Sequence, residues 1–150
     1  NEYLKGHYEA GRSNIEGHRQ AAMHYQRALE LDPTLALAWA GQAASRSFIT
    51  GFSDTDFKAG FEEARASALR SLALDPDLPE AHMALAEIQS ALDWDWAAAE
   101  ASLQHALSLR PGDANIRLQL ANIKCVWLMG WLTRGDKRRR GYCLSPPAAA

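Results

Sequence analysis

The side chains with the widest chemical range in this sequence are five histidines and two cysteines. No two histidines stand four residues apart, so no helix presents a two-histidine metal site. Cys125 and Cys143 form neither a CxxC pair nor a zinc-finger spacing. Cys125 lies in an apolar stretch and is predicted to be a small buried residue. We expect His82 to be a packed ring, and His18 and His24 to be solvated. No metal site is predicted.

Two groups of charged residues are also candidates for a chemical role. Asp93 and Asp95 are a carboxylate pair, but their position at a predicted helix start favours a capping role. The basic run at 137–140 could contact nucleic-acid phosphate or an acidic partner, or it could be a solvated tail. We prefer the solvated tail because only Tyr142 offers a ring for base stacking. No GxGxxG, Walker or GxSxG motif is present. We therefore expect no catalytic residue and no cofactor.

Composition is that of one packed domain, with 150 residues, 47% of them hydrophobic and 23% charged. The net charge of -2 argues against a general nucleic-acid or membrane-surface binder. The longest apolar stretch, 125–132, is interrupted by Gly130 and is shorter than the ~20 residues of a membrane span. No signal-like segment follows Asn1, so we expect a piece of a longer chain. Cysteine usage weakly favours a reducing, cytoplasmic location.

A repeated hexapeptide organises the chain. The segments 28–33, 71–76 and 106–111 read ALELDP, SLALDP and ALSLRP. Counting back from each proline by 12, 8 and 5 residues meets a recurring set of mostly small residues. These are Ala21, Tyr25 and Ala28, then Ala64, Ala68 and Ser71, then Ala99, Leu103 and Ala106. Small residues at such positions let two helices approach closely, and each proline ends a helix and begins a turn.

These features resemble the tetratricopeptide repeat (TPR), whose pattern has small residues at positions 8, 20 and 27 and a proline at 32. The resemblance covers nearly residues 1–130. It implies an all-α fold, an α-α superhelix or TPR solenoid of antiparallel helix pairs. The expected units are 1–33, 34–76 and 77–111, followed by a final helix at 113–129 and an irregular tail at 131–150. Nine extra residues around 51–57 read as a polar turn lengthening the loop of the second unit, with Asp54, Thr55 or Asp56 as the helix cap. Asp95 is the expected cap in the third unit.

Two segments resemble one particular lineage of these repeats. The Asp-Trp-Asp-Trp turn at 93–96 and the segment 3–8, YLKGHY, look like a bacterial lineage of these repeats. In that lineage the repeats follow a winged-helix DNA-binding domain or a class III adenylate-cyclase-type domain. The resemblance therefore implies a sensor or regulatory part of a larger signalling or transcription-regulating protein.

The resemblance also implies where a partner would bind. In this family, peptides lie against the first helix of each pair, which predicts a groove whose residues are small, apolar and slightly acidic. The basic set with which some relatives clamp a chaperone's terminal carboxylate is absent, so a hydrophobic or basic segment suits the groove better. The alternative is that some of these residues pack against neighbouring helices or against another copy of the chain. The candidate residues are Leu37, Phe48, Glu80, Met83, Glu87, Asn115, Leu118 and Asn122.

Two functions remain open from the sequence. The first is an interaction scaffold for a protein or peptide partner, or for another domain of the parent chain. The second is a self-association element, in which an apolar patch on the last helix makes a homo-oligomer. That patch would consist of Trp127, Leu128, Met129 and Trp131. Neither function involves a membrane, and nucleic-acid binding is not expected for this segment.

Overall fold

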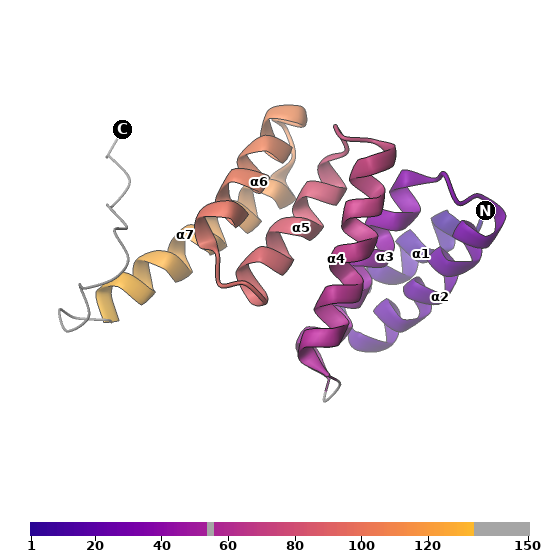
Figure 1. Ribbon diagram of the computed structural model, residues 1–150, viewed down its shortest axis with the longest axis horizontal. Helices are drawn as coiled ribbons and strands as arrows, with labels where there is room; N and C mark the ends of the chain where they lie inside the picture. The colour runs from indigo at the N-terminus through magenta and orange to yellow at the C-terminus, as the bar shows by residue number, and fades with distance from the viewer. Residues whose placement is uncertain (54–55, 134–150) are drawn as a thin grey trace.

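The computed structural model describes the backbone of residues 1–53 and 56–133, and the side chains of residues 1–53 and 56–126. Within these residues the chain forms helices and no strand, as Figure 1 shows. The helices are α1 (Glu2–Ala10), α2 (Ile15–Leu31), α3 (Ala36–Phe52), α4 (Phe57–Leu74), α5 (Pro79–Ala91), α6 (Trp96–Leu109) and α7 (Ala114–Thr133). The all-α class predicted from the sequence is confirmed.

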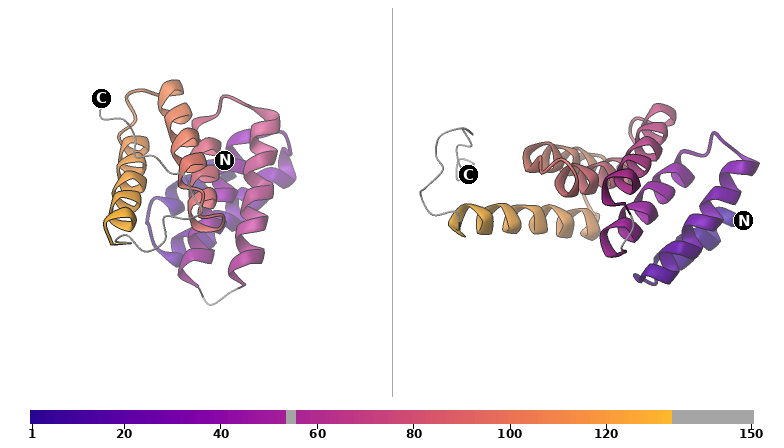
Figure 2. Two further views of the ribbon diagram at one scale, coloured as in Figure 1. Left: turned by 60° about the vertical axis from the view of Figure 1, so that its left-hand side comes forward. Right: turned by 60° about the horizontal axis from the view of Figure 1, so that its bottom comes forward.

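Consecutive helices pack in pairs, and the pairs stack along the molecule from α1 to α7 (Figures 1 and 2). The odd-numbered helices also touch one another, because α3 packs against both α1 and α5. One helix of each pair therefore lines a shared face of the stack. Helix α3 contacts α1, α2, α4 and α5, which makes it the centre of the fold.

The small-residue register predicted from the sequence is the core of the fold. All nine predicted residues of the three repeats are buried, with exposed fractions of 6% or less. Ala64 and Ala68 of α4 join Ala43 of α3 in one apolar cluster, while Ala99 and Leu103 of α6 join another. Alanines at the helix crossings allow this close approach, as expected.

The extra residues of the second unit lie mainly in its helices and not in a longer loop. Helices α3 and α4 have 17 and 18 residues, whereas α5 and α6 have 13 and 14. Helix α3 continues through Gly51 and Phe52, and α4 already begins at Phe57. The loop prediction was therefore wrong, because Gly51 and Phe52 form the last turn of α3 instead of a turn outside it.

Asp95, the cap expected for the third unit, and Asp56, one of the three considered for the second, both cap helices, and Asn14 is a further cap. Asn14 caps α2 by accepting a hydrogen bond from the Gly17 amide at 2.7 Å, and Ser13 has a φ of 52° in the turn before it. Asp56 accepts from the Ala59 amide at 3.1 Å, and Asp95 accepts from the Ala98 amide at 2.9 Å. These carboxylates satisfy amides that the first helical turn leaves unpaired.

A hydrogen bond from a side chain to a proline carbonyl recurs in every unit after the first. Trp39 donates through Nε1 to the carbonyl of Pro33 at 2.9 Å. His82 places Nε2 2.8 Å from the carbonyl of Pro76. Arg117 donates through Nη2 to the carbonyl of Pro111 at 2.5 Å. Each bond ties the start of one pair to the turn that precedes it.

Several sequence expectations are corrected. Cys125 is exposed on α7, since the apolar stretch that holds it belongs to a helix packed chiefly on α6. Helix α7 continues to Thr133, so residues 131–133 are helical and not part of an irregular tail. The rest of the tail, with its basic run at 137–140, lies outside the described residues, as do the side chains of the proposed self-association patch at 127–131.

Candidate partner-binding groove

A groove with a volume of about 190 Å³ runs along the face that the odd-numbered helices share. Helices α1, α3, α5 and α7 all contribute side chains to it, and α2 adds His18 and Tyr25. The wall from α3 is made of Leu37 and a run of small residues. Because small residues leave room above the backbone, the groove lies where α3 faces α1 and α5.

Four of the eight predicted partner-binding residues line this groove, namely Leu37, Glu80, Met83 and Glu87. The predicted residues of α7 do not: Asn115, Leu118 and Asn122 are exposed on that helix, and Gln119 is the α7 residue that reaches the groove. Phe48 lies beside the groove residue His18, with ring centroids 3.9 Å apart, and also against Phe52 at 4.8 Å. Partner binding by any of these residues stays a prediction.

Sequence reasoning missed the contribution of the first helix. Tyr3, His7 and Ala10 of α1 all line the groove. The signal was available, because one TPR period of 34 residues separates Tyr3 from Leu37 and Ala10 from Ala44. Extending the register to the first unit would have identified both residues.

Tyr25 supports the floor of the groove from α2. It is buried, and its ring lies so close to two glycines that a Cβ at Gly6 would be 2.8 Å, and a Cβ at Gly41 2.5 Å, from the ring. Tyr25 therefore fits because α1 and α3 each present a bare backbone to it. Burial, reinforced by nearby Tyr3, raises the pKa of Tyr25 to about 12, so it stays a neutral phenol.

Two carboxylates give the groove its charge. Glu80 forms an ion pair through Oε1 with Arg110 Nη1 at 2.7 Å, while its Oε2 is buried with no hydrogen-bond partner among the described residues. The Glu87 carboxylate makes no ion pair or hydrogen bond in the described part of the chain. Burial raises the pKa of Glu87 to about 7. No lysine or arginine is among the side chains that line the groove.

Neither of the histidines predicted to be solvated is fully so. His18 packs on Phe48 and burial lowers its pKa, while its Nδ1 lies 3.4 Å from Ser45 Oγ. His24 lies 2.7 Å from Glu2, which ties α1 to α2. Hydrogen bonds from Lys5 and then from His24 lower the pKa of Glu2 to about 2. The sequence did not reveal the contacts of His18 and His24 because each joins different helices.

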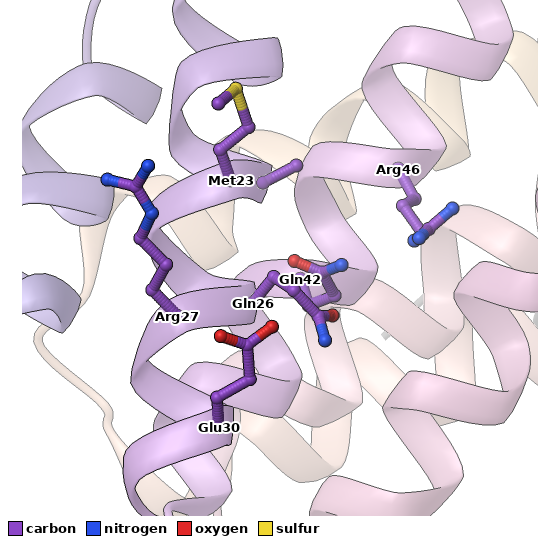
Figure 3. A pocket seen from close by; sticks show the side chains of 7 residues that line it. Met23, Gln26, Arg27, Glu30, Gln42 and Arg46 are labelled. Carbon is purple, nitrogen blue, oxygen red and sulfur yellow. The ribbon is translucent and has the colours of Figure 1, made fainter.

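A second hollow, of about 430 Å³, lies between α2 and α3 and shares no lining residue with the groove. Figure 3 shows its side chains, which include Arg27, Glu30 and Gln42. Gln42 is 3% exposed, and its Oε1 has no hydrogen-bond partner among the described residues. At the edge, Arg46 forms an ion pair with Glu63 of α4. Charges of both signs line this hollow, so its chemistry favours no single class of ligand.

Comparison with known structures decides what this arrangement of helices is. The TPR domain of OM64 from Arabidopsis superposes with a TM-score of 0.62 at 17% sequence identity, covering 83% of this chain and 92% of that domain. The chain has the TPR fold. No protein-family model matches the sequence, and no curated protein is significantly similar to it.

Two further TPR structures hold peptides. The first TPR of Spaghetti (RPAP3), bound to the HSP90 peptide SRMEEVD, has a TM-score of 0.62 at 16% identity and covers 85% of this chain and 90% of its own. The second TPR domain of human RPAP3, in complex with the HSP70 peptide SGPTIEEVD, has a TM-score of 0.58 at 20% identity, covering 82% and 95%. TPR folds of this size thus act as peptide-binding modules in other proteins.

The described residues contain neither a membrane-spanning helix nor a cluster suited to a metal ion. None of the helices within residues 1–53 and 56–133 combines the length and apolar character of a membrane crossing. In the same residues no three histidine, cysteine or acidic side chains gather in a group suited to a metal ion.

The raised pKa of Glu87 predicts a pH-dependent stability. Its ordinary pKa is 4.5 and its folded value about 7, so the native state holds a proton that the unfolded chain releases between these values. The stability that Glu87 contributes is therefore full below pH 4.5 and is lost as the pH rises through 7. Replacing Glu87 with glutamine should leave unfolding unchanged near pH 4.5 and stabilise the protein by about 2–3 kcal/mol at pH 8.5.

Urea unfolding of both proteins at the two pH values tests this expectation. Glu30→Gln is the matched control, because Glu30 is exposed on α2 and should show the same small difference at both pH values. A Glu87→Gln effect that does not change between pH 4.5 and 8.5 would show that the carboxyl titrates normally.

Proposed function

We propose that this chain is a protein-interaction module that holds a segment of a partner protein in the groove between α1, α3, α5 and α7. The observation that carries the proposal is the groove itself, an open cavity walled by one helix of every pair. TPR domains of similar size are described as binding peptides of HSP90 and HSP70, which supports the same use of the fold here. The partner is either a separate protein or another domain of the parent chain.

The chemistry of the groove sets this chain apart from those two neighbours. Their peptides end in the acidic sequence EEVD. Glu80 and Glu87 lie on one wall of the groove, and none of its lining residues in the described part of the chain is lysine or arginine, so a segment ending in several carboxylates would meet like charge. We therefore expect a partner other than an EEVD terminus.

Selection from a displayed library of random 12-residue peptides, followed by affinity measurement, tests the groove. Met83 lines it, so Met83→Glu should weaken the selected peptides at least tenfold by placing a charge against their apolar surface. Met23→Glu is the matched control: Met23 is 52% exposed on α2 and lines the second hollow, so binding should not change. Circular dichroism checks that both variants remain helical.

Two results would refute groove binding. One is that no peptide is enriched on the wild-type chain above an unrelated helical protein. The other is that the selected peptides bind Met83→Glu as tightly as they bind Met23→Glu.

We also infer that the module is the sensor or regulatory part of a larger bacterial signalling or transcription-regulating protein. The support is the resemblance of the turn at 93–96 and of the segment 3–8 to TPR regions attached to winged-helix or adenylate-cyclase-type domains. In the structure this turn places Trp94 in the left-handed region, with a φ of 55°, and stacks it edge-on to Trp96. Sequencing the gene upstream of Asn1 tests the inference, which fails if neither type of domain is encoded there.

A further inference from the structure

Glu80 and Glu87 occupy one face of α5, seven residues apart. At 1.5 Å of rise per residue, this spacing puts them about 10 Å apart along the helix axis, two turns from one another. Both line the groove, and Met83 and Ala84 lie between them. The wall of α5 is therefore apolar in the middle and acidic at each end.

The two carboxylates differ in what they contact. One oxygen of the Glu80 carboxylate, Oε1, already forms an ion pair with Arg110 of the same chain. Glu87 has no such partner among the described residues. Glu87 is partly buried, and a carboxylate that has lost part of its contact with water without gaining a partner would be stabilised by a cation that reached it. Glu87 is therefore the more receptive of the two.

Among the described residues, no lysine or arginine of another helix lines the groove beside Glu87, and α4 and α6, which pack on α5, contribute no lining residue. Helix α1 presents Tyr3 and His7 to the groove, α2 presents His18 and Tyr25, and α7 presents Gln119. The residues from α3 are apolar or small and carry no titratable group. Tyr3 of α1 and Glu80 of α5 both line the groove, and burial and then Glu80 raise the pKa of Tyr3. The described residues therefore supply no lysine or arginine to Glu87, and a bound partner could bring one.

We propose that the Glu87 carboxylate forms an ion pair with one arginine side chain of the partner segment that lies in the groove. This binding site at Glu87 is called the arginine seat. This inference rests on the proposed function. Arginine fits better than lysine because its guanidinium pairs with a carboxylate in a fork and is more weakly hydrated. Its alkyl stem packs on Met83 and Ala44, which line the same cavity. The groove volume of about 190 Å³ equals about six waters at ~30 Å³ each, enough for one long side chain.

The seat makes binding depend on pH. A guanidinium favours the ionised carboxylate, and burial raises the pKa of free Glu87 to about 7. About one tenth of the free protein is therefore ionised at Glu87 at pH 6 and about nine tenths at pH 8, so affinity should rise about tenfold between them. His7 and His18 also face the groove and would repel a cation when protonated. Burial lowers the pKa of His18, which moves its titration towards more acidic pH.

The test uses peptides selected on the wild-type chain, each resynthesised with its arginine replaced by citrulline, a neutral isostere, or by lysine. Citrulline should weaken binding to the wild type at least tenfold, and lysine should weaken it less. Glu87→Gln should bind the arginine peptide at least tenfold more weakly, be indifferent to citrulline and lose the rise between pH 6 and 8. His7→Gln should keep that rise, and Glu30→Gln should behave as the wild type.

The outcomes separate this inference from the proposed function. If Met83→Glu abolishes binding but citrulline and Glu87→Gln have no effect, the groove binds peptides and the arginine seat is wrong. If the selected peptides carry no basic residue, the seat is wrong in the same way. If no peptide is selected at all, both the groove function and the seat are refuted.

Discussion

Replacing Gly41 with alanine is expected to lower the free energy of unfolding by about 1–3 kcal/mol, although alanine favours helix by about 1 kcal/mol over glycine. A Cβ at Gly41 would lie 2.5 Å from the ring of Tyr25. The ring has nowhere to go, because Gly6 of α1 lies equally close against it and Tyr25 is only 3% exposed. Helices α2 and α3 must therefore separate, which loosens both the core and the groove floor.

Gly51 provides the control within the same helix. A Cβ there meets nothing within 4 Å, so Gly51→Ala should be neutral or stabilise α3 by up to about 1 kcal/mol. The cause can be isolated by repeating Gly41→Ala in a Tyr25→Leu background, where the smaller side chain should reduce the penalty. Urea unfolding followed by circular dichroism measures the wild type, the three single variants and the double variant. Equal effects of Gly41→Ala and Gly51→Ala would show that the contact with Tyr25 is not what limits Gly41.

Truncating Leu103 to alanine should cost about 2–5 kcal/mol, the largest single effect expected in this chain. Leu103 is fully buried in α6, in a cluster with Ala86, Ala99, Ala106 and Ile116. Most of these neighbours are alanines, which have no other conformation that could fill the space. The cavity would therefore persist, and the cost should approach the upper part of the range.

The loss of stability should be largest near α7, because Leu103 joins α5 and α6 to α7 through Ala86 and Ile116. Hydrogen exchange should show the amides of α7 losing protection before those of α2 and α3. Leu31→Ala is the matched control, since Leu31 is 80% exposed at the end of α2 and should change stability by less than about 0.5 kcal/mol. A cost at Leu103 no greater than at Leu31 would contradict the assignment of this cluster as core.

The parts of this fold that could be predicted are those decided within one repeat. Residues such as Ala64 and Ala68 are small at fixed distances from a proline, and that local register was enough to place them in the core. The cap Asp95 could be predicted for the same reason, because a helix start is satisfied by residues next to it in the sequence.

The parts that escaped prediction depend on how successive units are rotated. Whether Gln119 or Leu118 of α7 reaches the groove follows from the curvature of the stack, which is a sum of small rotations between units. The environment of Glu87 depends on α1, α2, α3 and α5 together, so no single segment encodes its raised pKa. The stacking of His18 on Phe48 likewise joins residues of different units.

The three side chains that donate to a proline carbonyl show how the same structural link can be formed by different residues. Tryptophan, histidine and arginine share neither size, charge nor hydropathy, yet Trp39, His82 and Arg117 each place an N–H at the end of a long side chain within reach of the same acceptor. In this chain the bond therefore requires the reach of a donor and not one particular residue. A sequence comparison would treat these three residues as unrelated. The structure shows that all three form the same kind of hydrogen bond to a proline carbonyl.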